Sequence, residues 1–419
     1  MNTPKIRFKG FKDDWEQRKL IDYLDVSNEK NKKGDYKKTD VLSVSGEVGI
    51  VNQIEFQGRS FAGVSVENYG IVNEGDVVYT KSPLKANPYG IIKTNKGKVG
   101  IVSTLYAVYK PKENTDSNFV QIYFELDSRM NSYMHPLVNK GAKNDMKVSD
   151  ENALKGNVTF PKINEQKVIS NFITELDYLI TLHQRKCDET KQLKKFMLQK
   201  MFPENGEKNP EIRFEGFTDD WEQRKLSEIC ERITRKNRNN ESDLPLTIAS
   251  QFGLIDQRDF FNKVVAAKDM SNYYLLKKGE FAYNKSYSNG FDYGSIKRLN
   301  AYKQGCLSTL YICFGITSDE VESDYLECFF DTLKWYGDVS MICAEGARNH
   351  GLLNVDTTGF FDEVTVDLPK SLEEQKRISV YMNALNRLIT LHQRKCEKLK
   401  ELKKFMLQNM FVQYANASL

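Results

Sequence analysis

The chain contains two copies of the same pair of sequence blocks. Residues 4–20 read PKIRFKGFKDDWEQRKL and residues 210–226 read PEIRFEGFTDDWEQRKL, with 14 of 17 positions identical. The second pair, LITLHQRKCDETKQLKKFMLQKMF at 179–202 and LITLHQRKCEKLKELKKFMLQNMF at 388–411, is identical at 19 of 24 positions. The sequences between the blocks are far less alike. Near-identical ends around divergent middles indicate one scaffold that carries two different binding surfaces.

The composition is that of a folded protein with two domain-sized repeats. The 419 residues provide about 205 per repeat, and an apolar content of 40% argues against disorder. No apolar run approaches the length of a membrane span, and the start lacks a hydrophobic signal core, so we expect a cytoplasmic protein. Seven cysteines without a CxxC pair and four histidines predict reduced thiols and no metal site.

The net charge of +4 is unevenly distributed along the chain. Residues 179–202 and 388–411 each carry six basic and two acidic side chains, which leaves the rest of the chain near −4. This concentration of positive charge is compatible with an acidic or nucleic-acid partner.

Each repeat ends in a sequence typical of one long helix. Pro161 and Pro369 precede the predicted starts, Ser371 with Glu374 forms a capping box, and Asn164 can cap the first helix. Apolar residues then recur at heptad spacing over nearly forty residues, which favours a coiled coil about 60 Å long. These stripes are Ile169, Ile173, Leu176, Ile180, His183, Cys187, Met197 and Met201, and Ile378, Met382, Leu385, Ile389, His392, Cys396, Leu399, Met406 and Met410. Lys194 and Lys403 each interrupt a stripe.

The order of these parts predicts an α+β fold with an internal pseudo-twofold repeat. We expect each helix to bury its stripe against the other, antiparallel, with the two globular regions at opposite ends. The predicted parts are a first globular domain with its opening segment (1–160), a first spacer helix (161–203), a linker (204–209), a second globular domain (210–368) and a second spacer helix (369–412).

The divergent middles, residues 21–160 and 227–368, still share a topology. Both are rich in short β-branched and aromatic runs separated by Gly and Asn, which predicts strands. Matched blocks recur at an offset of 204–205: YTKS with YNKS, STLY with STLY, and GAKN with GARN. Such a constant offset indicates two domains with the same strands and different surfaces.

The repeated motifs resemble the specificity subunit of type I restriction–modification systems. The first set is Trp15 to Leu20, Gly75-Asp76-Val77, and Pro161 followed by Glu165-Gln166-Lys167-Val168-Ile169. The second set is Trp221 to Leu226, Gly279-Glu280-Phe281, and Pro369 followed by Glu374-Gln375-Lys376-Arg377-Ile378, with Glu280 in place of an aspartate.

That resemblance implies two β-rich target recognition domains separated by a long antiparallel two-helix coiled coil. It implies a DNA-binding, non-catalytic subunit of an adenine-specific methyltransferase and restriction complex, which reads the two halves of a bipartite, asymmetric target in double-stranded DNA. The implied partners are two methyltransferase (modification) subunits and restriction or motor subunits. S-adenosylmethionine, ATP and magnesium are expected in those partners and no cofactor in this chain.

Candidate DNA-contacting residues lie mainly in two repeated places. Lys81 and Lys285 follow a predicted strand and begin polar loops rich in Gly and Asn, and the GAKN and GARN blocks are a second pair. Ordinary solvated loops are the alternative, and packing is the alternative for the tyrosines. The candidates are Arg59, Lys81, Ser82, Asn87, Tyr89, Lys143, Asn144, Gln251, Lys285, Ser286, Tyr287, Asn289, Arg298, Arg348 and Asn349.

The basic helix residues allow three interpretations. They can contact phosphates, form the solvated outer face of a coiled coil, or dock a partner that meets both repeats. These residues are Arg185, Lys186, Lys194, Lys195, Arg394, Lys395, Lys403 and Lys404. His183 and His392 occupy the same stripe position and are more consistent with packing that sets the helix register than with a metal bridge.

No catalytic motif is recognisable. Asn87-Pro88-Tyr89 lacks the second proline of an adenine methyltransferase motif, and Val99 stands where a P-loop after Gly97-Lys98 requires Ser or Thr. The sequence therefore predicts a protein that binds and positions DNA. The alternatives are a stand-alone DNA-binding scaffold without enzymatic partners and a methyltransferase fused to its own recognition domain.

Overall fold

The computed structural model describes residues 3–81, 87–140, 146–204, 206–249, 253–261, 266–286, 290–349 and 352–412. Residues 139–140, 146–147, 344–349 and 352 are described by their backbone. The chain divides into two compact units, which we describe one at a time. Unit 1 comprises Met1–Gln184 with Gln393–Leu419, and unit 2 comprises Arg185–His392.

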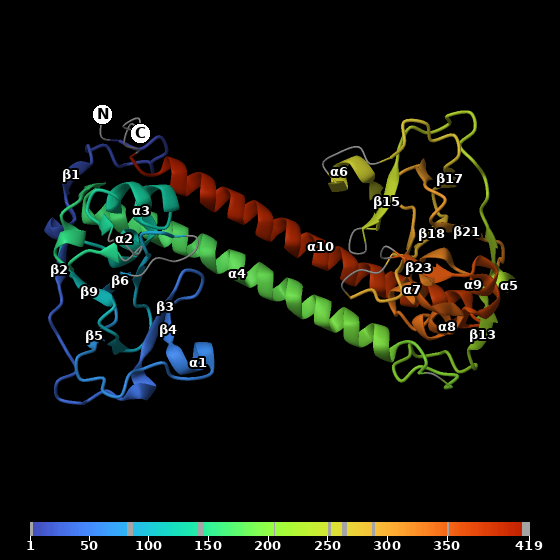
Figure 1. Ribbon diagram of the computed structural model, residues 1–419, viewed down its shortest axis with the longest axis horizontal. Coiled ribbons are helices and arrows are strands. Elements are labelled where there is room, and N and C mark those ends of the chain that lie inside the picture. The colour runs from blue at the N-terminus through green and yellow to red at the C-terminus, as the bar shows by residue number, and fades with distance from the viewer. Residues whose placement is uncertain are drawn as a thin grey trace. The chain divides into compact units, whose positions relative to one another are not determined.

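The first globular region, residues 21–160 of unit 1, is built on a four-stranded antiparallel sheet in the order β2-β9-β6-β7 (Figure 1). These strands are β2 (Leu24–Val26), β9 (Tyr106–Pro111), β6 (Val77–Thr80) and β7 (Ile92–Thr94). Two-stranded pairs flank it: β1 (Glu16–Lys19) with β12 (Asn157–Phe160), β3 (Leu42–Ser45) with β4 (Gly49–Asn52), β5 (Gly70–Val72) with β8 (Gly100–Val102), and β10 (Asn139–Lys140) with β11 (Met146–Lys147). The short helices are α1 (Gln53–Gln57), α2 (Ser117–Tyr123) and α3 (Asp127–Met134).

The second globular region, residues 227–368 of unit 2, repeats this topology. Its four-stranded sheet has the order β14-β21-β18-β19, formed by β14 (Cys230–Arg232), β21 (Ile312–Ile316), β18 (Phe281–Asn284) and β19 (Ser295–Arg298). The flanking pairs are β13 (Glu222–Lys225) with β24 (Thr365–Leu368), β15 (Leu246–Ala249) with β16 (Gly253–Asp256), β17 (Tyr274–Lys277) with β20 (Gln304–Leu307), and β22 (Cys343–Asn349) with β23 (Leu352–Val355). Its helices are α5 (Leu226–Ile229), α6 (Gln257–Phe261), α7 (Ser323–Asp331), α8 (Tyr336–Ile342) and α9 (Thr357–Glu363). The expectation of one topology built twice is confirmed.

The first three residues of the central strand of each sheet are apolar because both faces of the strand are covered. Successive side chains of a strand point to opposite faces. In β6, Val77 and Tyr79 enter the main core of unit 1, whereas Val78 enters a smaller core between the sheet and the flanking strands. In β18, Phe281 and Tyr283 enter the main core and Ala282 enters the smaller one.

The two long helices, α4 (Ile163–Lys200) and α10 (Leu372–Asn409), pack antiparallel within each unit. In unit 1, the Cys396 Sγ lies 3.9 Å from the Ile180 carbonyl oxygen. Seven residues further along α10, the Lys403 Nζ lies 2.6 Å from Asp177, three residues back along α4. In unit 2, the Cys187 Sγ lies 3.9 Å from the Ile389 carbonyl oxygen. Among the described residues, no helix is long and apolar enough to cross a membrane.

The heptad stripes bury more than a coiled-coil seam. Ile169, Ile173 and Leu176 belong to the main core of unit 1, together with Leu407 and Met410 from the other helix. In unit 2 the equivalent core contains Ile378, Met382 and Leu385 with Met201. Each globular region therefore packs on a pair of helix halves, which explains why the stripes are so regular.

The repeated terminal blocks meet each other at two equivalent junctions. Trp15 lies 6.2 Å from Phe411 between ring centroids in unit 1, and Trp221 lies 6.1 Å from Phe202 in unit 2. The Ile6 amide donates to the Asn409 carbonyl at 3.0 Å, and the Ile212 amide donates to the Lys200 carbonyl at 2.8 Å. Each junction joins the opening block of one repeat to the closing block of the other.

The start of each helix is held by the opening segment. Arg7 pairs with Glu165 at 2.7 Å and Arg213 pairs with Glu374 at 2.7 Å. The Glu374 amide donates to the Ser371 hydroxyl at 3.4 Å, but the Glu374 carboxylate binds Arg213 instead of completing a capping box. The prediction that Asn164 caps α4 is wrong, because the helix begins at Ile163 and Asn164 lies inside its first turn.

Candidate nucleic-acid interface

In unit 1, the candidate loop begins directly after the central strand β6. The Lys81 Nζ forms an ion pair with Asp150 at 2.8 Å, with 23% and 32% of the two side chains exposed. The Asn87 amide donates to Asp127 at 2.5 Å. The Tyr89 ring is buried and contacts the His135 ring edge-on, which supports a packing role for this tyrosine.

In unit 2, the equivalent loop follows β18 and lies against the β22–β23 hairpin. Lys285 and Ser286 are half-buried, and the Ser286 amide donates to the Asn284 side chain at 3.0 Å. The Leu353 amide of β23 donates to the Lys285 carbonyl at 2.9 Å. Arg348 and Asn349 end β22, where their backbones pair with Leu353 and Leu352.

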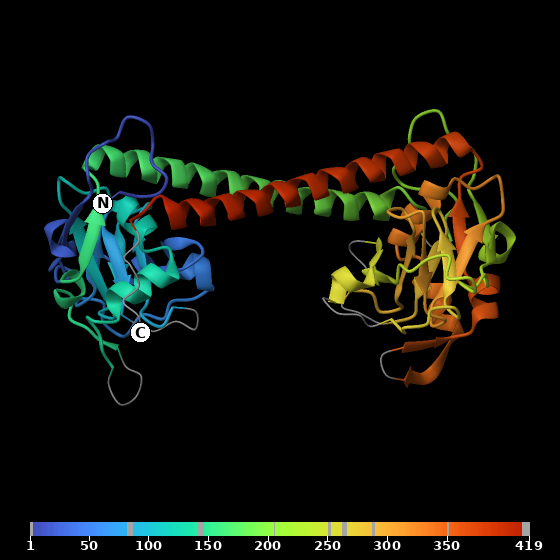
Figure 2. The same cartoon turned by 90° about the horizontal axis from the view of Figure 1, so that it is seen from above.

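In each unit the segment after the central strand contacts a residue of, or just after, a two-stranded pair. In unit 1 the contact is Lys81 with Asp150, just after the β10–β11 pair, and in unit 2 it is Lys285 with Leu353. We call the described residues Lys81, Asn87 and Asp150, and Lys285, Ser286 and Leu353, the loop–hairpin surfaces. In Figure 2 the β22–β23 hairpin extends from unit 2 on the side away from that unit's helix halves. Ser82, Lys143, Asn144, Gln251, Tyr287 and Asn289 lie outside the described residues.

A left-handed glycine and a buried tyrosine fix the base of each loop. Gly90 has φ +77° and Gly294 has φ +80°, and an added Cβ would lie 2.0 Å from the Thr80 carbonyl or 2.1 Å from the Asn284 carbonyl. The Tyr79 hydroxyl donates to the Tyr89 carbonyl at 2.9 Å, and the Tyr283 hydroxyl donates to the Tyr293 carbonyl at 2.8 Å. Burial raises the pKa of both phenols, so both remain hydrogen-bond donors at neutral pH.

The two other arginine candidates have different surroundings. Arg59 is exposed, with its guanidinium 4.6 Å from the centre of the Phe61 ring. Arg298 is only 12% exposed and pairs with Asp324 and, at 3.0 Å, with Glu327. Its donors are therefore engaged inside unit 2.

The eight basic helix residues fall into two classes. Arg185, Lys186, Lys195, Arg394, Lys395 and Lys404 are exposed. Lys194 and Lys403 are half-buried and paired, Lys194 with Asp331 at 2.7 Å and Lys403 with Glu125 at 2.5 Å and Asp177 at 2.6 Å. The interruptions of the apolar stripe are therefore internal contacts.

Sequence reasoning missed a set of exposed apolar residues at equivalent positions. Phe196 and Phe405 are 47% and 50% exposed, and Leu193 and Leu402 are 41% and 37% exposed. We call Leu193 with Phe196, and Leu402 with Phe405, the outer apolar patches. The globular regions also expose Phe56 and Leu105, and Phe260 and Leu310, at matching positions. The sequence could have indicated these residues, because they are apolar and recur in both repeats although they lie outside the heptad stripe.

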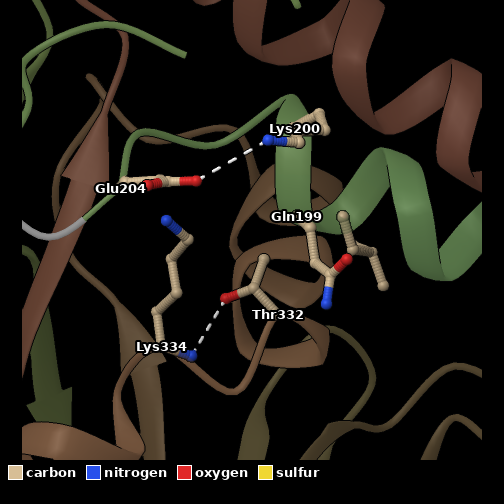
Figure 3. A pocket seen from close by; sticks show the side chains of 6 residues that line it. Gln199, Lys200, Glu204, Thr332 and Lys334 are labelled. Carbon is tan, nitrogen blue, oxygen red and sulfur yellow. Dashed lines mark hydrogen bonds and ion pairs between the residues drawn. The ribbon is translucent and has the colours of Figure 1, made fainter. Parts of the chain in front are cut away.

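A hollow of about 620 Å³ lies at the end of α4, and the charged side chains that line it each have a hydrogen-bond or ion-pair partner (Figure 3). It is lined by Leu198, Gln199, Lys200, Glu204, Thr332 and Lys334. Lys334 donates to the carbonyls of Phe202 and Pro203, and Lys200 pairs with Glu204 and Glu211. The described residues also contain no His, Cys, Asp and Glu cluster that could hold a metal ion.

Comparison with known proteins shows what this chain is similar to. Residues 12–192 match the family model of the type I restriction modification DNA specificity domain. The type I restriction–modification S subunit from M. genitalium matches at 12% identity over 99% of this chain and 100% of its own, with a TM-score of 0.59, and shares the fold. The HsdS subunit from Thermoanaerobacter tengcongensis matches at 15% identity over 95% of this chain and 96% of its own, with a TM-score of 0.44.

A further solved structure, which concerns complex assembly and conformational transition of the type I R-M system, matches at 16% identity over 95% of this chain and 97% of its own, with a TM-score of 0.46. Among curated protein sequences, none matches the chain significantly.

Proposed function

We propose that this chain is a type I restriction–modification DNA specificity subunit and reads a bipartite, asymmetric DNA target through its two globular regions. The observation that carries the proposal is the identical strand order of the two four-stranded sheets beneath different surface residues. Two globular regions of the same topology can each bind one DNA segment. Because their surface residues differ, the two segments should differ in sequence.

The loop–hairpin surfaces are the proposed contacts with DNA. The first combines Lys81 with the Asn87 amide and the second combines Lys285 with the Ser286 hydroxyl, each on a loop whose base is fixed by glycine and tyrosine. Lysines contact phosphates and set the register, whereas polar side chains on loops and hairpins read base edges in the major groove. Lys81 would exchange its partner Asp150 for a phosphate when DNA binds.

The outward faces of the helices are the proposed docking sites for two methyltransferase subunits. The two outer apolar patches consist of the same residue types. In each patch an exposed lysine, Lys195 or Lys404, directly precedes the phenylalanine. A surface present twice with the same residues suits a partner that is present twice, whereas the divergent loops suit two different half-sites. Restriction or motor subunits complete the proposed complex.

In this arrangement the chain positions DNA and its partners carry out the chemistry. The methyltransferase subunits would bind S-adenosylmethionine and flip the target adenine out of the duplex. The motor subunits would use ATP and magnesium.

The decisive experiment maps methylated adenines across the genome with and without this gene. We expect one split, asymmetric motif, two specified segments around a fixed number of unread bases, that disappears on deletion and returns on complementation. A methylation pattern that is unchanged by deletion, or a motif with one undivided segment, contradicts the proposal.

A further inference from the structure

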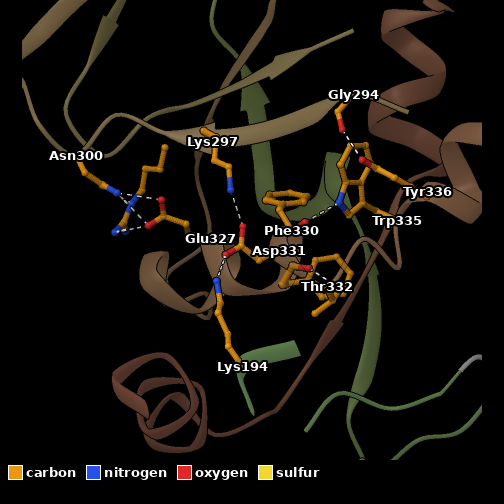
Figure 4. A network of polar contacts seen from close by, with 12 residues as sticks. Lys194, Gly294, Lys297, Asn300, Glu327, Phe330, Asp331, Thr332, Trp335 and Tyr336 are labelled. Atoms are coloured by element: carbon orange, nitrogen blue, oxygen red, sulfur yellow. Dashed lines mark hydrogen bonds and ion pairs between the residues drawn. The ribbon is translucent and has the colours of Figure 1, made fainter. Parts of the chain in front are cut away.

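Lys194 joins three elements of unit 2 through one carboxylate. Its Nζ lies 2.7 Å from one oxygen of Asp331, and the Nζ of Lys297 lies 2.6 Å from the other oxygen (Figure 4). Lys194 belongs to α4, Asp331 ends α7 and Lys297 lies on the edge strand β19. The three side chains are 14–19% exposed. The Asp331 carboxylate thus links α4 to the sheet of the globular region.

In unit 1, equivalent positions build the part of this link that joins the long helix to the end of the helix covering the sheet. Lys403 corresponds to Lys194 in the repeat, and its Nζ lies 2.5 Å from Glu125 and 2.6 Å from Asp177. Glu125 follows α2 as Asp331 ends α7, and Lys93 on β7 corresponds to Lys297 on β19. In unit 1, Asp177 on α4 supplies a second acid where α10 has Asn386. Both lysines occupy an otherwise apolar stripe position.

These groups are charged in spite of their burial. Burial disfavours a charged Asp331, yet Lys297 and Lys194 lower the pKa of its carboxyl to about 2. Burial also opposes the charge of Lys403, but Glu125 and Asp177 outweigh it and raise the pKa of that amine. A buried ion pair contributes little to stability relative to apolar packing, and its best-attested use is to fix one arrangement among several.

We propose that Lys194 and Lys403 are positioning residues for DNA recognition, each fixing the angle at which one globular region is held on its helix pair. They act through Asp331 and Glu125, at the ends of the helices that cover the two sheets. Their exposed neighbours Lys195 and Lys404 remain available to partners. The inference rests on the proposed function, because an angle matters only if each globular region must meet its own stretch of DNA.

The test uses the full-length chain assembled with its methyltransferase subunits. Methylation is measured on duplexes that carry the two target segments separated by the native number of unread bases, or by one to three bases more or fewer. The variants are Lys194→Met, Asp331→Asn and Lys403→Met. Lys191→Met is the matched control, since it removes an exposed lysine of α4 within one turn of Lys194 that belongs to neither proposed contact surface. Lys194→Arg retains the charge and tests rescue.

We expect Lys194→Met, Asp331→Asn and Lys403→Met to lower methylation at the native separation about tenfold or more, because small misplacements in bound geometry are costly. They should also accept neighbouring separations that the wild type rejects, while binding the methyltransferase subunits normally. Lys194→Arg should restore most of the preference, and Lys191→Met should keep it unchanged.

A uniform loss at every separation, with the preference preserved, overturns the proposal, because that is what simple destabilisation produces. Loss of methyltransferase binding in Lys194→Met that exceeds the loss in Lys191→Met also overturns it and makes the lysine a docking residue. If the wild-type complex itself shows no preferred separation, the proposed function fails and not merely this inference.

Discussion

At the scale of single residues, the repeated motifs are contacts and not isolated signatures. Glu165 and Glu374 bind the arginine of the repeated IRF sequence, while Gln166 and Gln375 accept from the amides of Asp116 and Glu322 and donate to the carbonyls of Pro161 and Pro369. The glutamate–glutamine pair therefore ties the helix start to two other segments in each unit. This explains why the motif occurs twice although the intervening sequence differs.

The first residue-scale prediction concerns phosphate contact by Lys81. We expect Lys81→Ala to weaken DNA binding and to reduce the slope of log affinity against log salt by about 1, because one phosphate contact is lost. Binding titrations at several salt concentrations measure this. Lys162→Ala is the control, since Lys162 is also a lysine paired with an aspartate, Asp13 at 2.7 Å, but lies at the start of α4. Equal slopes for both variants and the wild type contradict the contact.

A second prediction concerns the glycine that fixes the loop base. Gly90→Ala must both adopt a left-handed backbone and displace the Thr80 carbonyl. Gly75→Ala is the matched control, because Gly75 has φ +86° with nothing within 4 Å of an added Cβ. We expect the control to lose about 1 kcal/mol of unfolding free energy and Gly90→Ala several times as much. Denaturant titrations measure both, and equal losses contradict the close approach.

The buried carboxylate of Asp331 gives a pH-dependent prediction. Because its folded pKa lies near 2, below the ordinary value of 3.8, its charge stabilises unit 2 by about 2 kcal/mol above pH 4, and this contribution is lost as the pH falls toward 2. Asp331→Asn should therefore differ most from the wild type at pH 7, clearly less at pH 3 and least near pH 2. Urea unfolding, followed by Trp221 and Trp335 fluorescence in a Trp15→Phe background, measures this. A constant difference between pH 7 and pH 3 contradicts it.

At the scale of elements, each long helix has two distinct faces. One face carries the stripe into the core of a globular region, and the other exposes the outer apolar patch with basic residues. Periodicity predicted the first face. It could not predict the second face, because the sequence does not distinguish an exposed Leu or Phe outside the stripe from one buried in a core.

The outer apolar patches give the element-scale prediction. We expect Phe196→Ser to weaken one methyltransferase docking event and Phe405→Ser the other, each by about 2 kcal/mol, as for aromatic residues at the centre of interfaces. Mass measurement of the assembled complex should show one methyltransferase subunit lost per variant and two lost in the double variant. Tyr178→Ser is the control, since Tyr178 is 60% exposed but corresponds to Arg387 in the second repeat. Full occupancy in all three variants excludes the patches.

The sequence predicted the helices and the duplication, but it did not predict which distant residues pair with the buried charged side chains. Apolar spacing and block identity are local properties, so the positions of α4 and α10 followed from them. The partner of Lys194 is 137 residues away and that of Lys403 is 278 residues away, so both lysines read as interruptions. Arg298 was predicted as a DNA contact for its charge, whereas the acidic residues that pair with it lie on α7.

At the scale of the whole molecule, two globular regions with one topology should be exchangeable separately. We expect replacement of residues 21–160 by the corresponding region of another family member to change one segment of the methylated motif and leave the other intact. Replacement of residues 227–368 should have the reciprocal effect. Methylation mapping of both chimaeras provides the measurement. If either chimaera changes both segments, the two regions do not read independently.

Because the Ile6 amide bonds to the Asn409 carbonyl, unit 1 is completed only after residues near 409 have been synthesised. Unit 2 is a continuous stretch of chain, whereas the core of unit 1 requires Leu407, Met410 and Phe411. The residues of unit 1 before position 185 must therefore wait for residues 407–411, which are synthesised later. A ribosome that stops before residue 407 releases a chain in which the later unit has all its residues and the earlier one lacks part of its core.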